Sequence, residues 1–314
     1  MNARDLGIYF FSFVCHNRNM QIIYRMDRIF IVVYVCLILV IGVALYISSG
    51  RPVVWVVTVV VEMVYLYFAL KHPWSRYRAV MQPFPVEWRP LVAQHSAIYA
   101  NLDVVGKQRF ERDMQIFLSD FSIEGIRRQP MDISIKLPIA TAFAAMLFGR
   151  PDWEPPIKDG VIVYPGRSFN RNYTLGRGNY EGMAMVNAPL IVTEESLRQS
   201  FAYPGDGDNV VFHELAHYFD FEDGLADGIP MARLMPGEEC VLRWREIIGR
   251  EWEKASQGLS YLRAYAGTNE AELFAVAVEM FFENPHLMKS NSPEFYDLLK
   301  EFFNLDPAAI IGER

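Results

Sequence analysis

Two long apolar runs near the start of the chain constrain most strongly what it can fold into. The run at Ile29–Ser48 reads IFIVVYVCLILVIGVALYIS without a charged residue, and the run at Val53–Leu70 carries a single charge, Glu62. About 20 apolar residues are enough for a helix to cross a bilayer. Buried core helices and a cleaved signal peptide are the alternatives, but helices apolar on every face are rare in small domains, and no small-residue cleavage site follows the first run. We therefore predict a transmembrane helical hairpin that turns at Ser49–Pro52.

Basic residues predict the orientation of this hairpin. They flank its two outer ends, with Arg18, Arg25 and Arg28 before it and Lys71, Arg76 and Arg78 after it. Because cytoplasmic flanks carry the excess of Lys and Arg, both outer ends should be cytoplasmic. We expect an integral protein of a bacterial inner or plasma membrane, with the remainder of the chain in the cytoplasm. Glu62 is costly in lipid, and we expect it in a contact between helices, since one carboxylate makes no transport pathway.

The remainder of the chain has the composition of an ordinary globular protein. The formal net charge is −7, which argues against nucleic acid as a partner. The three cysteines are scattered, so neither a disulfide framework nor a thiolate metal site follows. The predicted organisation is a cytoplasmic segment at 1–28, the hairpin at 29–70, a juxtamembrane helical region at 71–135 and a globular domain at 136–314.

Hydrophobic periodicity and capping residues predict the elements of this globular part. Helices are expected at Gln108–Phe121, Ile135–Phe148, Glu194–Phe201 (capped by Thr193), Glu238–Ala255 and Thr268–Glu283, and short strands at Val161–Tyr164 and Leu190–Val192. The pattern is α+β, rich in helices with a small sheet, preceded by the two transmembrane helices.

The stretch NVVFHELAHYFDFEDG at Asn209–Gly224 carries the chemistry. On a helix over Val210–Phe219, His213 and His217 lie one turn apart on the same face, so both imidazoles can meet one metal ion. Glu214 projects beside them, where it can reach a water rather than the metal. This is the HExxH pattern of zinc peptidases, although a buried helix with hydrogen-bonded histidines is the alternative.

Caps and a stop delimit the helix that carries this motif. Asp206 or Asp208 is the expected N-cap, and Gly224 is the expected stop.

The third metal ligand is left open by spacing. A catalytic zinc site usually has three protein ligands, and none of the other histidines continues the motif. The run Tyr265–Phe282 offers Glu270, Glu272 and Glu279, of which the last two lie seven apart and share a helix face. Glu272 fits equally well as the capping partner of Asn269.

Two motifs in this order resemble a known family. The runs DGDNVVFHELAHYFDFEDGLADGIP (Asp206–Pro230) and TNEAELFAVAVEMFF (Thr268–Phe282), with VIVYPGRSF (Val161–Phe169) upstream, are similar to the Mlc titration factor family of zinc-dependent peptidases. The late helix also resembles the catalytic domain of anthrax lethal factor around its third zinc ligand. The resemblance covers roughly Lys136–Pro285 and does not extend to the hairpin.

The resemblance implies a zincin-like metallopeptidase domain with a gluzincin-type site. In it, His213, His217 and Glu272 would hold Zn²⁺, and Glu214 would be the general base. Tyr265, seven residues before Glu272, matches a tyrosine near the oxyanion, with an ordinary half-buried tyrosine as the alternative.

Three further features have expected roles. Asp220 and Asp227 match acidic positions of the family, and we expect them to be structural rather than to orient a histidine. The strand at Leu190–Val192 is expected to pair with an extended substrate.

Two functions follow as hypotheses. The first is a membrane-anchored zinc peptidase that hydrolyses peptides or protein termini in the cytoplasm. The second is a membrane-tethered factor that binds and sequesters a regulatory protein, with the zinc fold as scaffold, since the resembled family includes a member that titrates a repressor. Proteolysis within the bilayer would need HELAH inside an apolar run, and the motif lies far from both. The substrate, the endo- or exopeptidase specificity and the oligomeric state are not set by the sequence.

Overall fold

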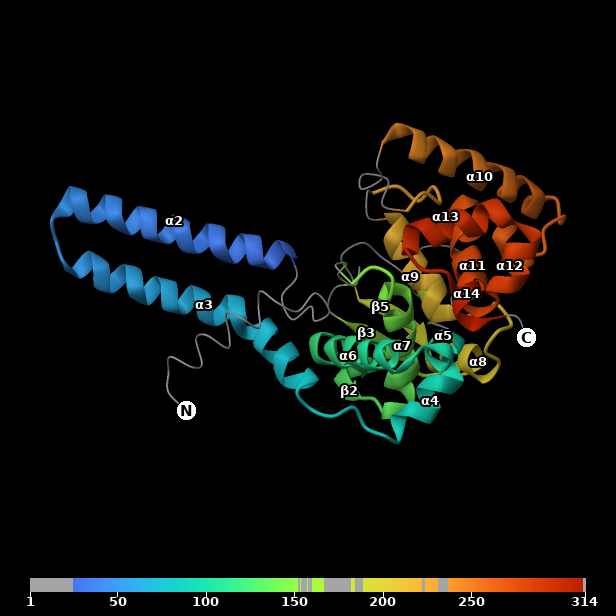
Figure 1. The fold of residues 1–314 in the computed structure, drawn as a ribbon, viewed down its shortest axis with the longest axis horizontal. Helices are drawn as coiled ribbons and strands as arrows, with labels where there is room; N and C mark the ends of the chain where they lie inside the picture. Colours follow the sequence, from blue (N-terminus) through green and yellow to red (C-terminus); the bar gives the residue numbers. More distant parts are fainter. Residues whose placement is uncertain are drawn as a thin grey trace. The chain divides into compact units, whose positions relative to one another are not determined.

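The computed structural model describes residues 25–151, 153, 157, 160–166, 182–183, 189–221, 224–230 and 237–312. The described residues form two compact units, one that reaches to Gln82 and one that begins at Pro83 (Figure 1). The finer boundaries expected after residues 28, 70 and 135 remain predictions.

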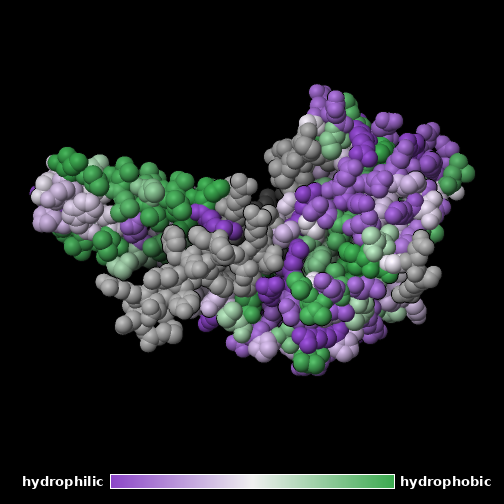
Figure 2. All heavy atoms as spheres, in the orientation of Figure 1, coloured by the Kyte–Doolittle hydropathy of each residue, from purple (hydrophilic) through white to green (hydrophobic). Residues whose placement is uncertain are grey.

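The first unit contains two antiparallel helices, α2 (Arg25–Ser49) and α3 (Val53–Val80), joined by a short turn. Gly50 in this turn has φ +61°, a left-handed conformation that glycine adopts without strain. Both helices are long and apolar enough to cross a bilayer, and most of their large apolar side chains are exposed. Figure 2 shows them as a largely hydrophobic surface.

Small and aromatic side chains bring α2 and α3 together. A Cβ on Gly42 would lie 2.6 Å from Thr58 Oγ1, so only glycine permits this approach of the two helices. The Tyr65 hydroxyl donates to the Phe30 carbonyl oxygen at 3.4 Å. Glu62 is half-buried in this unit, and its Oε1 has no hydrogen-bond partner among the described residues.

The second unit is a small sheet with helices packed around it. Its helices are α4 (Trp88–His95), α5 (Ala97–Asn101), α6 (Val104–Asp120), η1 (Ile126–Arg128), α7 (Ile133–Leu147), α8 (Glu194–Ala202), α9 (Val210–Asp220), α10 (Glu238–Ser256), η4 (Ala264–Gly267), α11 (Glu270–Glu283), α12 (Pro285–Asn291), α13 (Pro293–Phe303) and α14 (Pro307–Ile311). Its strands are β1 (Ile123–Gly125), β2 (Gln129–Pro130), β3 (Val161–Tyr164), β4 (Gly182–Met183) and β5 (Leu190–Thr193). The predicted α+β class, rich in helices with a small sheet, is confirmed.

The strands lie in the order β2-β1-β3-β5-β4. The central strands β1, β3 and β5 are parallel, whereas the outer strands β2 and β4 pair antiparallel with their neighbours. The prediction that Leu190–Val192 pairs with substrate is therefore wrong for this strand. Both edges of β5 already carry a strand, and a backbone has no third set of ladder hydrogen bonds to offer.

Two buried helices organise the core. Helix α7 is buried along most of its length and packs against α4, α6, α8 and α9, while α11 packs against α9, α10, α12, α13 and η4. Helix α9 contacts both of them, as well as β4 and β5. The helix that carries the histidines is thus held between the sheet and the C-terminal helices.

The N-cap of α9 differs from the prediction. Asn209, not Asp206 or Asp208, caps the helix, and its Oδ1 accepts from the backbone N–H groups of Val211 at 3.1 Å and Phe212 at 3.3 Å. Asp206 is engaged within the preceding turn, where its Oδ1 accepts from the Asp208 N–H at 3.0 Å. The predicted cap of α8 by Thr193 is confirmed, since its hydroxyl accepts from the backbone of that helix.

Candidate metal centre

Helices α9 and α11 lie side by side and position the site. All residues of α9 from Val210 to Asp220 are buried, and α11 is buried along most of its length. The rings of Phe212 and Phe282 stack across the two helices at a centroid distance of 4.9 Å. Because buried side chains in such a contact have little rotational freedom, polar groups on the facing sides are held in fixed places.

The last residue of α11 fixes the turn that leads into α9. The Glu283 carboxylate accepts from the backbone N–H groups of Gly205 at 3.3 Å and Gly207 at 3.2 Å, and from Asn209 Nδ2 at 2.9 Å. Burial raises the pKa of Glu283 to about 7, and these hydrogen bonds oppose that rise. The start of the histidine helix is therefore attached to the helix that faces it.

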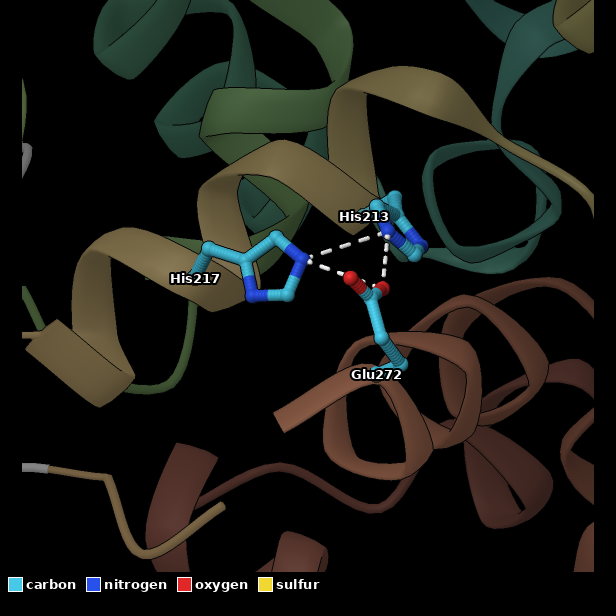
Figure 3. A group of neighbouring side chains, drawn as sticks. All are labelled: His213, His217 and Glu272. Carbon is cyan, nitrogen blue, oxygen red and sulfur yellow. Dashed lines mark hydrogen bonds and ion pairs between the residues drawn. The ribbon is translucent and has the colours of Figure 1, made fainter. Parts of the chain in front are cut away.

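Three potential metal ligands converge between the two helices (Figure 3). His213 Nε2 lies 3.0 Å from Glu272 Oε2 and 3.2 Å from His217 Nε2. His217 Nε2 lies 3.3 Å from the same Glu272 oxygen. The two imidazoles come from one face of α9 and the carboxylate comes from α11, so the three groups point toward one shared position.

The spacing of these atoms fits a zinc ion. Zinc at its usual bond lengths of about 2.1 Å with tetrahedral angles separates its ligand atoms by about 3.4 Å. A carboxylate oxygen and the lone pairs of two neutral imidazoles repel one another when they converge without a cation. A divalent cation relieves that repulsion and leaves one coordination position open for a water or a substrate oxygen.

Glu279 holds the outer face of His213. Its Oε1 lies 2.7 Å from His213 Nδ1, and its Oε2 accepts from the Asn209 N–H at 2.5 Å. The carboxylate is fully buried. A hydrogen bond from Nδ1–H to a carboxylate fixes the tautomer that leaves Nε2 free for a metal.

The electrostatics of this site favour positive charge. Burial lowers the pKa of His213, but the Glu279 charge and the hydrogen bonds to Glu272 and Glu279 raise it to about 10. Burial raises the pKa of Glu272, yet its hydrogen bonds with His213 and His217 hold it well below its usual range. The carboxylates of Glu272 and Glu279, which raise the pKa of His213, also favour a metal cation at the site.

Glu214 and Tyr265 lie at the same site. Glu214 is buried, and burial raises its pKa while the charges of His213 and His217 lower it. The half-exposed ring of Tyr265 lies 5.7 Å from the His213 ring, measured between centroids. Burial and the charge of Glu272 raise the pKa of Tyr265 to about 12, so its hydroxyl keeps its proton at neutral pH.

The glutamates that spacing left open occupy different places. Glu272 faces the Nε2 atoms of both histidines, whereas Glu279 faces the Nδ1 atom of His213. Glu270 is the first residue of α11, and its backbone carbonyl packs against Gly228. The role of Glu272 as a ligand remains a prediction that this geometry supports.

Asp220 and Asp227 have different surroundings. Asp220 is fully buried at the end of α9. Asp227 Oδ1 accepts from the backbone N–H of Ile229 at 3.2 Å, an interaction within its own loop. The contact of Asp227 agrees with the structural role that we expect for it.

Sequence reasoning missed Arg263. This residue lies in the loop before η4, and it forms ion pairs with Glu279 and with Asp208. An arginine in a loop without periodicity gives no signal of such contacts. Asn209 could have been found, because a cap residue stands directly before the first helical residue.

Comparison with known proteins identifies the family. The profile described as glucose-regulated metallo-peptidase M90 matches residues 71–304. The chain belongs to this family. The M90 match begins directly after the second apolar run, so the hairpin lies outside the matched residues.

Individual proteins are also similar to this M90 chain. A protein of Synechocystis sp. described as uncharacterized is 26% identical over 274 residues, which cover 82% of this chain and 98% of the relative. Mlc titration factor A of Yersinia pestis is 28% identical over 197 residues, 57% of this chain and 72% of the relative, and that of Yersinia pseudotuberculosis matches equally. The predicted resemblance to the Mlc titration factor family is confirmed.

Proposed function

We propose that this chain is a zinc-dependent peptidase anchored in a membrane. The observation that carries the proposal is the convergence of His213 Nε2, His217 Nε2 and a Glu272 oxygen, all within 4.8 Å of one another. The chain's membership of a metallopeptidase family supports the same reading. A zinc ion held there would supply Lewis acidity to the carbonyl of a peptide bond and to the attacking water.

Glu214 moves the proton in the proposed reaction. It lies next to His213 on a buried helix turn, and its raised pKa brings the carboxylate closer to the pKa range in which it can accept and return a proton near neutral pH. It takes the proton from the attacking water and passes it to the amine that leaves.

Tyr265 stabilises the oxyanion in the proposed reaction. It keeps its proton at neutral pH and lies at the half-exposed side of the site, where it can donate a hydrogen bond to the oxygen that becomes negative.

The hairpin anchors the peptidase in the proposed arrangement. Its apolar side chains are exposed along both helices, as expected for surfaces that face lipid. The basic residues at its outer ends favour a cytoplasmic location of the peptidase unit. Substrates would then be peptides or protein ends close to the membrane.

A second candidate function is suggested by the names of the relatives. The Yersinia proteins are named for titration of Mlc, so a protein-binding role with the zinc fold as scaffold is the alternative for this chain. In that case a regulatory protein rather than a substrate would be the partner.

The first experiment measures the zinc content of the full chain in detergent, beside Glu272→Gln and the matched control Glu270→Gln. We expect about one zinc per wild-type and control chain and markedly less in Glu272→Gln, since an amide is a weaker zinc ligand than a carboxylate. A folded wild-type chain without zinc would refute the proposed site. Full zinc content in Glu272→Gln would refute Glu272 as the third ligand.

A second variant separates hydrolysis from binding. Glu214→Gln keeps the size of the side chain and removes its function as a base. We expect hydrolysis of a mixed peptide substrate to fall by about 10²–10⁴-fold with zinc content unchanged. A wild-type chain that binds zinc but hydrolyses no peptide, in parallel with Glu214→Gln, would favour the sequestering function.

A further inference from the structure

Arg263 contacts several groups of the candidate centre although it lies outside the motif. Its Nη2 donates to Glu279 Oε1 and lies 3.3 Å from His213 Nδ1. Its Nη1 lies 3.3 Å from Asp208 Oδ1, in the turn before α9. The guanidinium carbon lies 5.6 Å from the centroid of the Tyr265 ring. One side chain therefore links the turn, the outer face of a histidine and the tyrosine.

Side-chain exposure decreases from Asp208 through Arg263 to Glu279. The Asp208 side chain is 62% exposed, that of Arg263 is 35% exposed and that of Glu279 is fully buried. A buried carboxylate is strongly destabilising unless it is paired and hydrogen-bonded. The Arg263 guanidinium forms an ion pair with the Glu279 carboxylate. Arg263 thus compensates a charge that no water reaches.

The contacts of the guanidinium are with carboxylates of the protein itself. Its two terminal nitrogens contact Glu279 and Asp208. Its Nε is buried and has no hydrogen-bond partner among the described residues. This arrangement favours support of neighbouring side chains over recognition of a substrate carboxylate.

We propose that Arg263 is a positioning residue of the metal centre, which keeps Glu279 against Nδ1 of His213 and is itself held by Asp208. This inference rests on the proposed use of zinc. The contacts fit it, because the guanidinium is paired with the buried Glu279 carboxylate, and that carboxylate contacts Nδ1 of His213. Arg263 acts through Glu279, so its effect on the metal depends on that carboxylate.

A double-mutant cycle on the full chain in detergent tests this dependence, with zinc affinity measured by competition with a chromogenic chelator. We expect Arg263→Gln to weaken zinc binding by about 10–100-fold, the range typical for loss of an outer partner of a metal-bound histidine. Glu279→Gln should weaken it by a similar factor. Adding Arg263→Gln to Glu279→Gln should then change the affinity by less than about twofold, because the path through Glu279 is already lost.

Conservative and control variants complete the test. Arg263→Lys keeps the charge but not the two-pronged geometry, and it should recover part of the affinity. Arg243→Gln removes an exposed ion pair with Glu301 that lies outside the site and should leave zinc affinity unchanged. If Arg263→Gln does not fold, Asp208→Asn is the milder probe, with an expected loss of a few-fold that also disappears in the Glu279→Gln background.

Two results would overturn the inference. Wild-type zinc affinity in Arg263→Gln would show that the contact does not position the centre. An equal loss in the wild-type and Glu279→Gln backgrounds would show that Arg263 acts independently of Glu279. In both cases the wild-type chain binds zinc and the proposed function stands, whereas a wild-type chain that binds no zinc refutes the proposed function itself.

Discussion

Helices α2 and α7 are both rich in apolar residues, yet they have opposite surroundings. Most residues of α7 are buried by neighbouring helices and strands, whereas α2 exposes most of its large apolar side chains. The difference lies in length, since α2 has 25 residues and α7 has 15. A helix needs about 20 apolar residues to cross a bilayer. Length is therefore the feature that makes α2, but not α7, a candidate for crossing a bilayer.

A second contrast concerns polar groups. Between residues 29 and 70 the hairpin has two charged residues, Arg51 and Glu62, whereas α9 and α11 bury His213, Glu214, His217 and Glu279. Buried ionisable groups are costly to the fold unless they are paired, and they concentrate at functional sites. The following experiments use this contrast, from the largest expected effect to the smallest.

Removal of zinc should affect only the globular unit. We expect a chelator to abolish peptide hydrolysis and to lower the melting temperature of the globular unit, because zinc bound to the folded state stabilises it by mass action. The helical signal of the detergent-solubilised hairpin should persist above that transition. Circular dichroism and differential scanning calorimetry would measure both, and unchanged hydrolysis after chelation would contradict the zinc mechanism.

Truncation of a buried and of an exposed phenylalanine should affect stability differently. Phe281 on α11 is fully buried, and Phe68 on α3 is exposed. We expect Phe281→Ala to lower the free energy of unfolding by about 3–5 kcal/mol through lost contacts and a cavity. Phe68→Ala should change it by less than about 0.5 kcal/mol. Denaturant unfolding in detergent gives both values. Equal losses in the two variants would contradict the difference in their surroundings.

A charge in the middle of α2 tests whether lipid surrounds it. Val40 on α2 is 64% exposed and Val105 on α6 is 63% exposed. In a membrane-insertion assay, we expect Val40→Arg to raise the apparent free energy of inserting α2 by about 2.5–3.5 kcal/mol. Val105→Arg should leave the stability of the globular unit within about 0.5 kcal/mol. Unchanged insertion of Val40→Arg would remove the reason to place α2 in the bilayer.

The most gradual effect is expected from Glu283, at most about 1.4 kcal/mol per pH unit. Burial raises its pKa to about 7 in the folded chain from a reference value of 4.5, so the folded state binds more protons than the unfolded state between these values. The free energy of unfolding should therefore fall as pH rises from about 4.5 through 7, with a slope of at most one proton. Glu283→Gln should flatten that part of the profile, as measured by chemical unfolding at several pH values. An identical profile in the variant would contradict the raised pKa.

The parts of the fold set by local pattern could be predicted from the sequence. The strand at Val161–Tyr164 and the cap at Thr193 follow from local propensity, and both are present as expected. The two-residue strand β4 could not be predicted, because its pairing with β5 depends on contacts distant in sequence. The same pairing removed the free edge that we expected on Leu190–Val192.

The candidate site could likewise be predicted only in part from the sequence. The helical spacing of His213 and His217 predicts that they share a face, whereas spacing could not decide between Glu272 and Glu279. Both glutamates reach His213, but they reach opposite nitrogens of one ring. Only the packing of α11 against α9 separates the two positions. Arg263 depends on a loop that folds over this contact, and no local pattern encodes it.

The positions of the acidic residues on α11 make the site sensitive to an insertion or a deletion in this helix. Glu272, Glu279 and Glu283 each contact a different part of α9 or of the turn before it. Their separations of seven and four residues keep them near one face, because each residue advances the helix by about 100°. Inserting one residue near Val276 would leave Glu272 in place and rotate the other two away by about a quarter of a turn. Over this stretch, homologous chains should accept many substitutions but no insertion or deletion.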